Sequence, residues 1–288
     1  MRNRIRHAVV HGSVNIALAV ALSAAASLRA GATDSCSFEN SPTECGFFEQ
    51  SVSGGRASLT STARDGASGV RLHTEPGDNN IAGSGSNERD DLALSPSVTA
   101  CAEGVEQWWA HSVYFPDDYV IPPSGSTWNW GIVFDFHHTG STGQPNFAIA
   151  SLPSGLELRV AGGPAEVQGP GPGMTQAPIG PVIKNAWYDF VYHVRWSSLA
   201  DGFFYATLNG KVVMDYAGPT LYVGEQCYLK LANYHTPIGQ PVSVIHDRIK
   251  RAGTQAELSA RNGTAVALFL ARGKTAEMVA RAPASSHE

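Results

Sequence analysis

The sequence predicts an all-β protein, a jelly-roll sandwich with one concave face that forms a groove. Short runs rich in β-branched and aromatic residues recur along the chain, each bounded by Gly, Pro, Asn or Asp. This is the pattern of strands joined by turns. No helical segments alternate with the runs, which favours a sandwich over a parallel α/β fold. Single sandwich domains of this length are common.

The amino-terminal segment predicts a secretory signal over residues 1–32. Arg2, Arg4 and Arg6 precede the apolar run "IALAVALSAAA", and 30–32 is a small-x-small cleavage pattern. The alternative is a short membrane anchor, although no stop-transfer flank follows. No later apolar run approaches about eighteen residues. We therefore expect a secreted or periplasmic protein without a membrane span in its mature form.

All four cysteines follow this segment, and an even count in an exported chain suggests two disulfides. Three pairings are possible. We favour Cys36–Cys45, which closes a short local loop, together with Cys101–Cys227. Because no Cys-x-x-Cys spacing occurs, the sequence gives no reason to expect a cysteine metal site.

The predicted domain covers residues 33–252. Its clearest strand runs are "WWAHSVYF", "WGIVFDF", "NFAIASL", "LELRV", "WYDFVYHVRW", "FFYATLNG", "KVVMDY" and "YLKLANY". Asn209-Gly210 predicts a type I′ hairpin turn. Residues 162–181 are so rich in Gly and Pro that we expect neither strand nor helix there, but a long loop, either substrate-covering or a disordered insertion. Residues 253–288 form a tail, helical or disordered, to which we assign no chemistry.

The net charge of −5 argues against a nucleic-acid partner, and removing the Arg-containing signal makes it more negative. A polyanion would therefore need a local cluster of basic residues. Side chains alternate between the two faces of a strand. Three runs place titratable groups on the face opposite their apolar residues: Arg89 and Asp91 in "NERDDLAL", Asp135 and His137 in "FDFHH", and Tyr228, Lys230 and Tyr234 in "YLKLANY". Each alone could be an ordinary salt bridge, hydrogen-bonded histidine or exposed sheet surface.

Together, "RDDL" at 89–92, "DFH" at 135–137 and "YLKLANY" at 228–234 resemble the motifs of the jelly-roll polysaccharide lyases. These include glucuronan lyases, alginate lyases and the heparin-lyase-I type, whose pattern is Arg-x-Glu-Leu, Gln-x-His and Tyr-Phe-Lys-x-Gly-x-Tyr. The resemblance covers roughly residues 36–253. It implies a concanavalin A-like sandwich that cleaves a uronic-acid polysaccharide by β-elimination.

The resemblance also implies roles for four catalytic residues. Arg89 binds the substrate carboxylate, which must be neutralised before the C5 proton can leave. His137 is a candidate base or neutraliser, and Tyr234 abstracts the C5 proton or protonates the leaving oxygen. Asp135 stands where the family has a neutral Gln. An ionised Asp135 could not donate a hydrogen bond to the substrate and would repel it.

Four explanations for Asp135 stay open. It could be protonated beside a bound carboxylate, a cation could bridge the two carboxylates, or it could orient His137 or Arg89. The activity could also have changed or been lost. Two smaller departures are Asp91 in place of Glu and Ala232 in place of Gly.

As further substrate-binding residues we expect Asp91, Lys230, Tyr228 and Trp130, with Trp130 able to stack on a sugar ring. We expect no cofactor, with calcium as an option, and a monomer whose partner is an acidic polysaccharide. Two other functions remain alternatives. One is a glycoside hydrolase, which needs two suitably spaced carboxylates such as Asp91 and Asp135. The other is a non-catalytic carbohydrate-binding protein.

Overall fold

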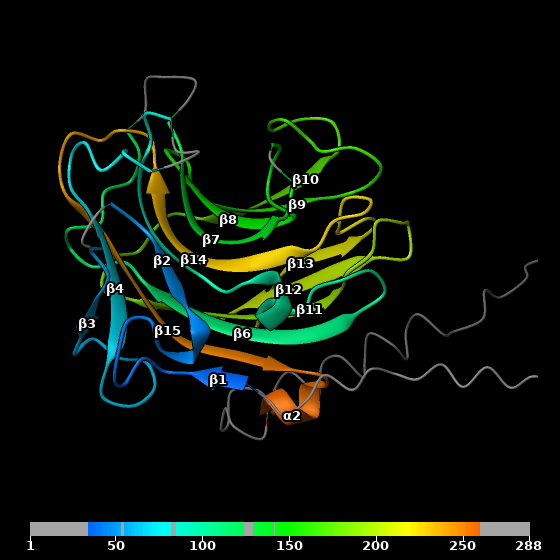
Figure 1. The fold of residues 1–288 in the computed structure, drawn as a ribbon, viewed down its shortest axis with the longest axis horizontal. Helices are drawn as coiled ribbons and strands as arrows, with labels where there is room; N and C mark the ends of the chain where they lie inside the picture. Colours follow the sequence, from blue (N-terminus) through cyan, green and yellow to red (C-terminus); the bar gives the residue numbers. More distant parts are fainter. Residues whose placement is uncertain (1–33, 53–54, 82–84, 124–128, 141, 260–288) are drawn as a thin grey trace, which may run out of the picture.

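The computed structural model describes residues 34–52, 55–81, 85–123, 129–140 and 142–259. The predicted signal at 1–32 and residues 260–288 of the predicted tail lie outside this part of the chain. Among the described residues, no helix is both long and apolar enough to cross a lipid bilayer. The chain folds into two antiparallel sheets, one of which curves like a trough with its concave side away from the other (Figure 1).

Within the described residues, the flatter sheet has eight strands. In spatial order they are β13 (Lys211–Ala217), β12 (Phe203–Leu208), β11 (Trp187–Arg195), β6 (Glu106–Tyr114), β15 (Val242–Ala252), β4 (Gly69–Thr74) and β3 (Ser58–Thr60), with β1 (Asp34–Cys36) also paired to β15. The hairpin between β12 and β13 turns at Asn209 and Gly210. Both have positive φ, of 49° and 77°, as the predicted type I′ turn requires.

The curved sheet has seven strands in the described part of the chain. Their order is β10 (Met174–Gly180), β9 (Gly155–Ala161), β8 (Phe147–Leu152), β7 (Gly131–His138), β14 (Cys227–His235), β5 (Glu88–Ala93) and β2 (Phe48–Gln50). The described residues also form three short helical segments: η1 (Glu44–Gly46), α1 (Pro96–Thr99) and α2 (Gln255–Ser259). Leu258 of α2 is buried against Ala110 and Ala252, so this part of the tail packs on the sandwich.

The expectation that residues 162–181 contain no strand was wrong, because β10 occupies their second half. β10 pairs with β9 and is the last strand of its sheet in the described residues. Proline lacks the backbone N–H that a central strand must donate, but an edge strand tolerates this loss. Pro178 therefore fits here, and the register shifts between Pro178 and Gly180. Only residues 162–173 form the loop.

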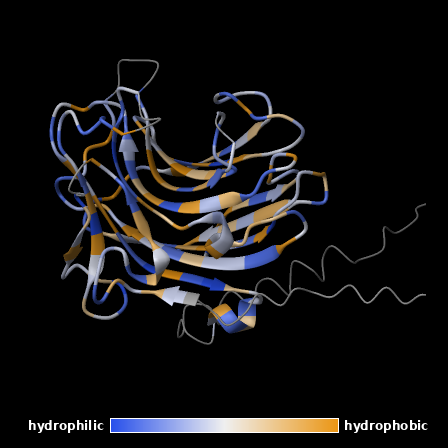
Figure 2. Ribbon diagram, viewed as in Figure 1, coloured by the Kyte–Doolittle hydropathy of each residue, from blue (hydrophilic) through white to orange (hydrophobic). Residues whose placement is uncertain are grey.

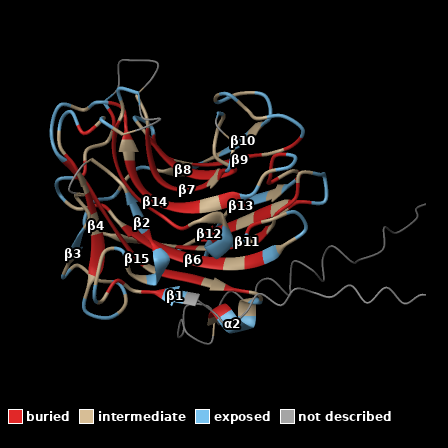
Figure 3. Cartoon of the chain, in the orientation of Figure 1, coloured by how far each residue is buried: buried red, intermediate tan, exposed pale blue. Residues whose placement is uncertain are grey.

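The core lies between the two sheets, where the apolar face of most strands is buried (Figure 3). Apolar and polar residues alternate along many of the strands (Figure 2). In β7, Phe134 and Phe136 point into this core and are about fully buried, which leaves Asp135 and His137 on the concave face. Burial of one such aromatic side chain is worth about 2–3 kcal/mol. The face assignment of β7 is therefore set by its two phenylalanines.

The two disulfides are those that the sequence favoured. Cys36 pairs with Cys45, and Cys101 pairs with Cys227. The second bond ties the segment before β6 to the first residue of β14, the strand that carries Lys230 and Tyr234. Paired cysteines are typical of proteins from oxidising compartments.

Candidate active site

A cavity of about 410 Å³ lies on the concave face of the curved sheet. Six of the residues singled out from the sequence line it: Arg89 of β5, Asp135 and His137 of β7, Lys230 and Tyr234 of β14, and Trp130 just before β7. The three motifs, far apart in the sequence, meet because β5, β14 and β7 are neighbours in the sheet. Asp91 and Tyr228 are not among the lining residues.

Strand register arranges the cavity face in two rows across the sheet. In the first row, Lys230 of β14 lies opposite Asp135 of β7, which lies opposite Ala148 of β8. In the second row, Tyr234 of β14 lies between Arg89 of β5 and Ile132 of β7. The second row continues to Ala150 of β8.

Register shifts bring these two rows together. The rows are four residues apart along β14, from Lys230 to Tyr234, but only two apart along β8, from Ala148 to Ala150. Two residue steps of a strand span about 7 Å. Extra residues of this kind bend a strand and are frequent beside active sites. In β7 the shift places Val133 and Phe134 both in the core, so that Ile132 joins Asp135 on the cavity side.

Arg89 is held by contacts on two sides. Its guanidinium carbon lies 3.8 Å from the centre of the Tyr234 ring, and its Nε lies 3.2 Å from a carboxylate oxygen of Asp91. The same Asp91 oxygen is 3.9 Å from Nζ of Lys230. Asp91 is fully buried. It therefore supports the two cations from beneath and does not line the cavity.

Two buried carboxyl groups compete for protons in this site. Burial raises the pKa of Asp135 to about 6, against the opposing pull of Lys230 and Arg89. Burial likewise raises the pKa of Asp91 to about 6, and the negative charge of Asp135 contributes to the rise. Since Asp91 has the closer cationic partner, in Arg89, we assign the negative charge to Asp91 and expect Asp135 to be the first of the two to take up a proton. One oxygen of Asp135 has no hydrogen-bond partner among the described residues.

His137 is a neutral base in this structure. Its Nδ1 lies 3.0 Å from the carbonyl oxygen of His138. A carbonyl only accepts, so Nδ1 carries the proton and Nε2 is left with a free lone pair. Burial, followed by the positive charge of Lys230, lowers the pKa of His137 to about 3. The imidazole is therefore unprotonated at ordinary pH, with Nε2 open to a proton, and its lowered pKa makes it a weak base.

Aromatic rings lie at both ends of this group. Trp130 meets the Tyr234 ring edge to face at 4.9 Å and is tied to Thr236 through backbone hydrogen bonds. Tyr228 lies opposite His137 in the register and stacks on its ring at 5.4 Å. Trp130 can thus contact a sugar in the cavity, whereas Tyr228 stands behind the histidine.

Sequence reasoning missed one charged residue of the cavity, Arg159 of β9. The run "LELRV" places Leu156, Leu158 and Val160 in the core, so alternation already predicts Glu157 and Arg159 on the opposite face. It went unnoticed because it belongs to none of the three motifs.

Two loops complete the wall of the cavity, through residues 142–145 and 168–170.

One group of side chains near the cavity could hold a metal ion. His138, Glu166 and Glu225 bring ligand atoms within 4.8 Å of one another. Nδ1 of His138 lies 2.6 Å from Glu225, and the Gly140 amide donates to the same carboxylate at 2.7 Å. These contacts already pair the groups without an ion. Cys36, Glu44 and Cys45 also cluster, but both sulfurs are in a disulfide and offer no thiolate.

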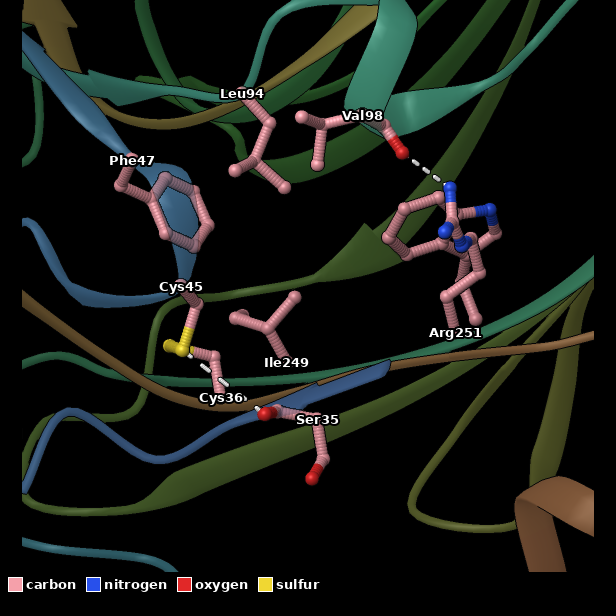
Figure 4. Close-up of a pocket in the computed structure, with 9 residues that line it drawn as sticks. Ser35, Cys36, Cys45, Phe47, Leu94, Val98, Ile249 and Arg251 are labelled. Carbon is pink, nitrogen blue, oxygen red and sulfur yellow. Dashed lines mark hydrogen bonds between the residues drawn. A yellow bond between two sulfur atoms is a disulfide. The ribbon is translucent and has the colours of Figure 1, made fainter. Parts of the chain in front are cut away.

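A second cavity, of about 460 Å³, lies beside the Cys36–Cys45 disulfide (Figure 4). Apolar side chains such as Phe47, Leu94 and Ile249 line it, and Arg251 donates to the carbonyl of Val98. No acid–base pair faces this space in the described residues.

This fold and this set of side chains define a β-sandwich protein with a charged groove. The chain belongs to the polysaccharide lyase family, whose sequence model matches residues 40–250. No curated protein matches the sequence.

Two solved structures share the fold at low identity. The endo-β-1,4-glucuronan lyase from the fungus Trichoderma reesei is 16% identical, with a TM-score of 0.59 over 73% of this chain and 92% of that one. The cellulose induced protein Cip1 is 15% identical, with a TM-score of 0.51 over 77% and 97% of the two chains. Both similarities support the concanavalin A-like sandwich that the sequence predicted.

Proposed function

We propose that the mature protein is a secreted or periplasmic lyase that cleaves a polysaccharide containing uronic acid by β-elimination. The observation that carries the proposal is the shared cavity of Arg89, His137 and Tyr234. A cation, a neutral base and a phenol at one site suit removal of a proton next to a carboxylate. Glucuronan and alginate are the first substrates to test, because the family contains lyases for both, and heparin-type glycans come next.

Neutralisation of the substrate carboxylate is the first requirement, and Arg89 supplies the charge for it. Asp135 supplies a proton, because burial has already raised its pKa to about 6 and a second carboxylate nearby raises it further. A protonated Asp135 donates a hydrogen bond, as the family's Gln would. A cation that bridged Asp135 and the substrate is the competing explanation, and a neutral substitution at Asp135 separates the two.

Proton transfer follows from where the carboxylate sits. C5 is bonded directly to the carboxylate carbon, so a carboxylate on Arg89 brings C5 next to Tyr234, whose ring lies 3.8 Å from the guanidinium. The C5–H and C4–O4 bonds break and a C4–C5 double bond forms. Where the sugar epimer presents C5–H on the far side, Nε2 of His137 takes the C5 proton and the Tyr234 phenol gives its own proton to the departing O4. Where both bonds share a side, Tyr234 reacts as a phenolate: it takes the C5 proton and passes that same proton to O4.

The two alternative functions have weaker support. A hydrolase would use Asp91 and Asp135 as its carboxyl pair, yet Asp91 is buried beneath Arg89 and does not line the cavity. A purely binding protein has no need for a desolvated base, and the lowered pKa of His137 is typical of catalytic sites.

Product chemistry tests the proposal. Purified protein is incubated with glucuronan, alginate and heparin, and near-ultraviolet absorbance and reducing ends are followed together. A lyase produces an unsaturated uronate that absorbs, in step with new reducing ends. Reducing ends without absorbance would identify a hydrolase, and neither signal, with binding retained, would identify a carbohydrate-binding protein.

A further inference from the structure

The far wall of the cavity holds a guanidinium that the elimination does not use. Arg159 lies in the same row as Asp135, two strands away, with only Ala148 between them. Neighbouring strands are about 4.8 Å apart, so the two backbones are separated by roughly 10 Å. Arg89 lies on β5, four strands from β9 in the same sheet, or roughly 19 Å at this strand spacing. Arg159 is therefore too remote for the carboxylate bound by Arg89.

Arg159 is held in place, yet its outer nitrogens are available. Its Nε donates to Glu157 at 2.8 Å, and Gln176 donates to the same carboxylate oxygen at 3.1 Å. The Arg159 side chain is 9% exposed and lines the cavity. Its two terminal nitrogens have no hydrogen-bond partner among the residues that the structure describes. Such a planar pair of donors matches the two oxygens of a carboxylate.

The floor between the two arginines is small and apolar. Ile132, Ala148, Ala150 and Ala232 form one buried cluster on this face. Alanines leave open space above the sheet, and a sugar ring can cover their apolar surface. A chain of linked sugars that extends across the strands from β5 toward β9 can therefore cover this apolar floor.

We propose that Arg159 is a second carboxylate-binding residue, which holds a uronic acid unit of the substrate other than the one being cleaved. The inference rests on the proposed function and narrows its substrate class. It favours a polymer with uronic acid at more than one position within the groove over one with a single isolated uronate. Because Arg159 contacts the remote unit before and during the reaction alike, it contributes to binding and not to the chemical step.

Rates on glucuronan oligomers of increasing length test this inference. For Arg159→Gln we expect kcat/KM on long oligomers to fall about tenfold or more, through KM, with kcat nearly unchanged. On the shortest oligomer that the wild type cleaves, kcat/KM should fall only slightly. Arg195→Gln is the matched control, because Arg195 pairs with Asp201 at 3.0 Å on the other sheet. Replacing Arg159 alone leaves the Glu157 carboxylate without its ion-pair partner. The double variant Glu157→Gln/Arg159→Gln removes that carboxylate as well, and it should behave like Arg159→Gln.

If Arg159→Gln lowers kcat/KM equally at every oligomer length, or at no length, the proposed role of Arg159 is overturned. A wild type that produces no unsaturated product from glucuronan, alginate or heparin would overturn the proposed function instead. In that case, direct titration still tests Arg159: in a Tyr234→Phe background, Arg159→Gln should weaken binding of a long uronate oligomer about tenfold and leave binding of a neutral glucan oligomer unchanged. Unchanged uronate binding would reject the inference.

Discussion

The guanidinium of Arg89 lies 3.8 Å from the centre of the Tyr234 ring, and the two residues are directly paired across β5 and β14. The cation that would bind a uronate carboxylate and the phenol that would move protons are thus fixed as one unit. Neither can shift without the other, because Trp130 packs against the ring and Asp91 pairs with the guanidinium. Placement of the carboxylate therefore also places C5.

Removal of the Tyr234 hydroxyl should abolish elimination and leave the fold intact. Tyr234→Phe keeps the ring on Arg89 and Trp130 and loses only a long hydrogen bond from Asn87, of 3.4 Å. Proton transfer by a positioned group contributes roughly 10²- to 10⁴-fold, so we expect kcat to fall by at least about 10²-fold. Near-ultraviolet absorbance measures the rate, and thermal unfolding checks the fold.

Tyr228→Phe is the control for this experiment. Tyr228 stacks on His137 but does not line the cavity, so the loss of its hydroxyl should reduce kcat far less. If the two variants lose activity equally, or if Tyr234→Phe keeps most of its activity, the assignment of proton transfer to Tyr234 fails.

Activity should decline as pH rises through about 6. The raised pKa of Asp135, about 6, results from burial. The protonated form, which donates to the substrate, is therefore present below this pH and is lost above it. The pH dependence of kcat/KM reports the pKa values of groups in the free enzyme. A plot of kcat/KM against pH should therefore show an alkaline limb that falls above about pH 6. His137, with a pKa lowered to about 3, stays neutral across the same range and adds no limb of its own near pH 6.

Asp135→Asn should remove the alkaline limb and keep most of the activity at low pH. Asn has no proton to lose and still donates a hydrogen bond. A bridging cation would give the reverse result, because an amide binds a divalent cation less well than a carboxylate does. Total loss of activity with substrate binding intact would therefore contradict the protonated form of Asp135.

Arg89→Lys should be severely impaired although the charge is conserved. Lysine presents a point charge and cannot form the paired hydrogen bonds of a guanidinium. Removal of one group that stabilises developing charge typically costs about 10²- to 10³-fold in kcat, and we expect a loss in this range. Arg195→Lys, at an exposed pair with Asp201, should keep full activity. A wild-type rate for Arg89→Lys would show that its charge alone suffices.

The two disulfides should contribute unequally to stability. Cys101–Cys227 closes a separation of 126 residues and Cys36–Cys45 one of 9. By loop entropy, removal of the long closure should cost about 5 kcal/mol and removal of the short one about 3 kcal/mol. Urea unfolding of the two double Cys→Ala variants measures the difference. Equal losses, or a larger loss for Cys36–Cys45, would contradict the entropic account.

Several features could be predicted from the sequence because they depend only on residues that are close together along the chain. Phe134 and Phe136 must be buried, and this choice alone sends Asp135 and His137 to the other face. The hairpin at Asn209-Gly210 follows from the backbone angles that these two residues tolerate. The order of the three motifs was enough to predict the lyase family and the sandwich fold.

Tertiary structure alone decided which strands are neighbours, and so which residues meet. Pairing of β5 with β14 placed Arg89 against Tyr234. Register shifts brought Ile132 to the cavity, a position that strict alternation of side chains along β7 does not predict. Pro178 proved compatible with a strand because β10 has only one strand partner in the described sheet. Arg159 joined the cavity through pairing of β8 with β9. A sequence determines the face of each side chain through its neighbours along the chain, whereas contacts between strands depend on long-range packing and hydrogen bonding.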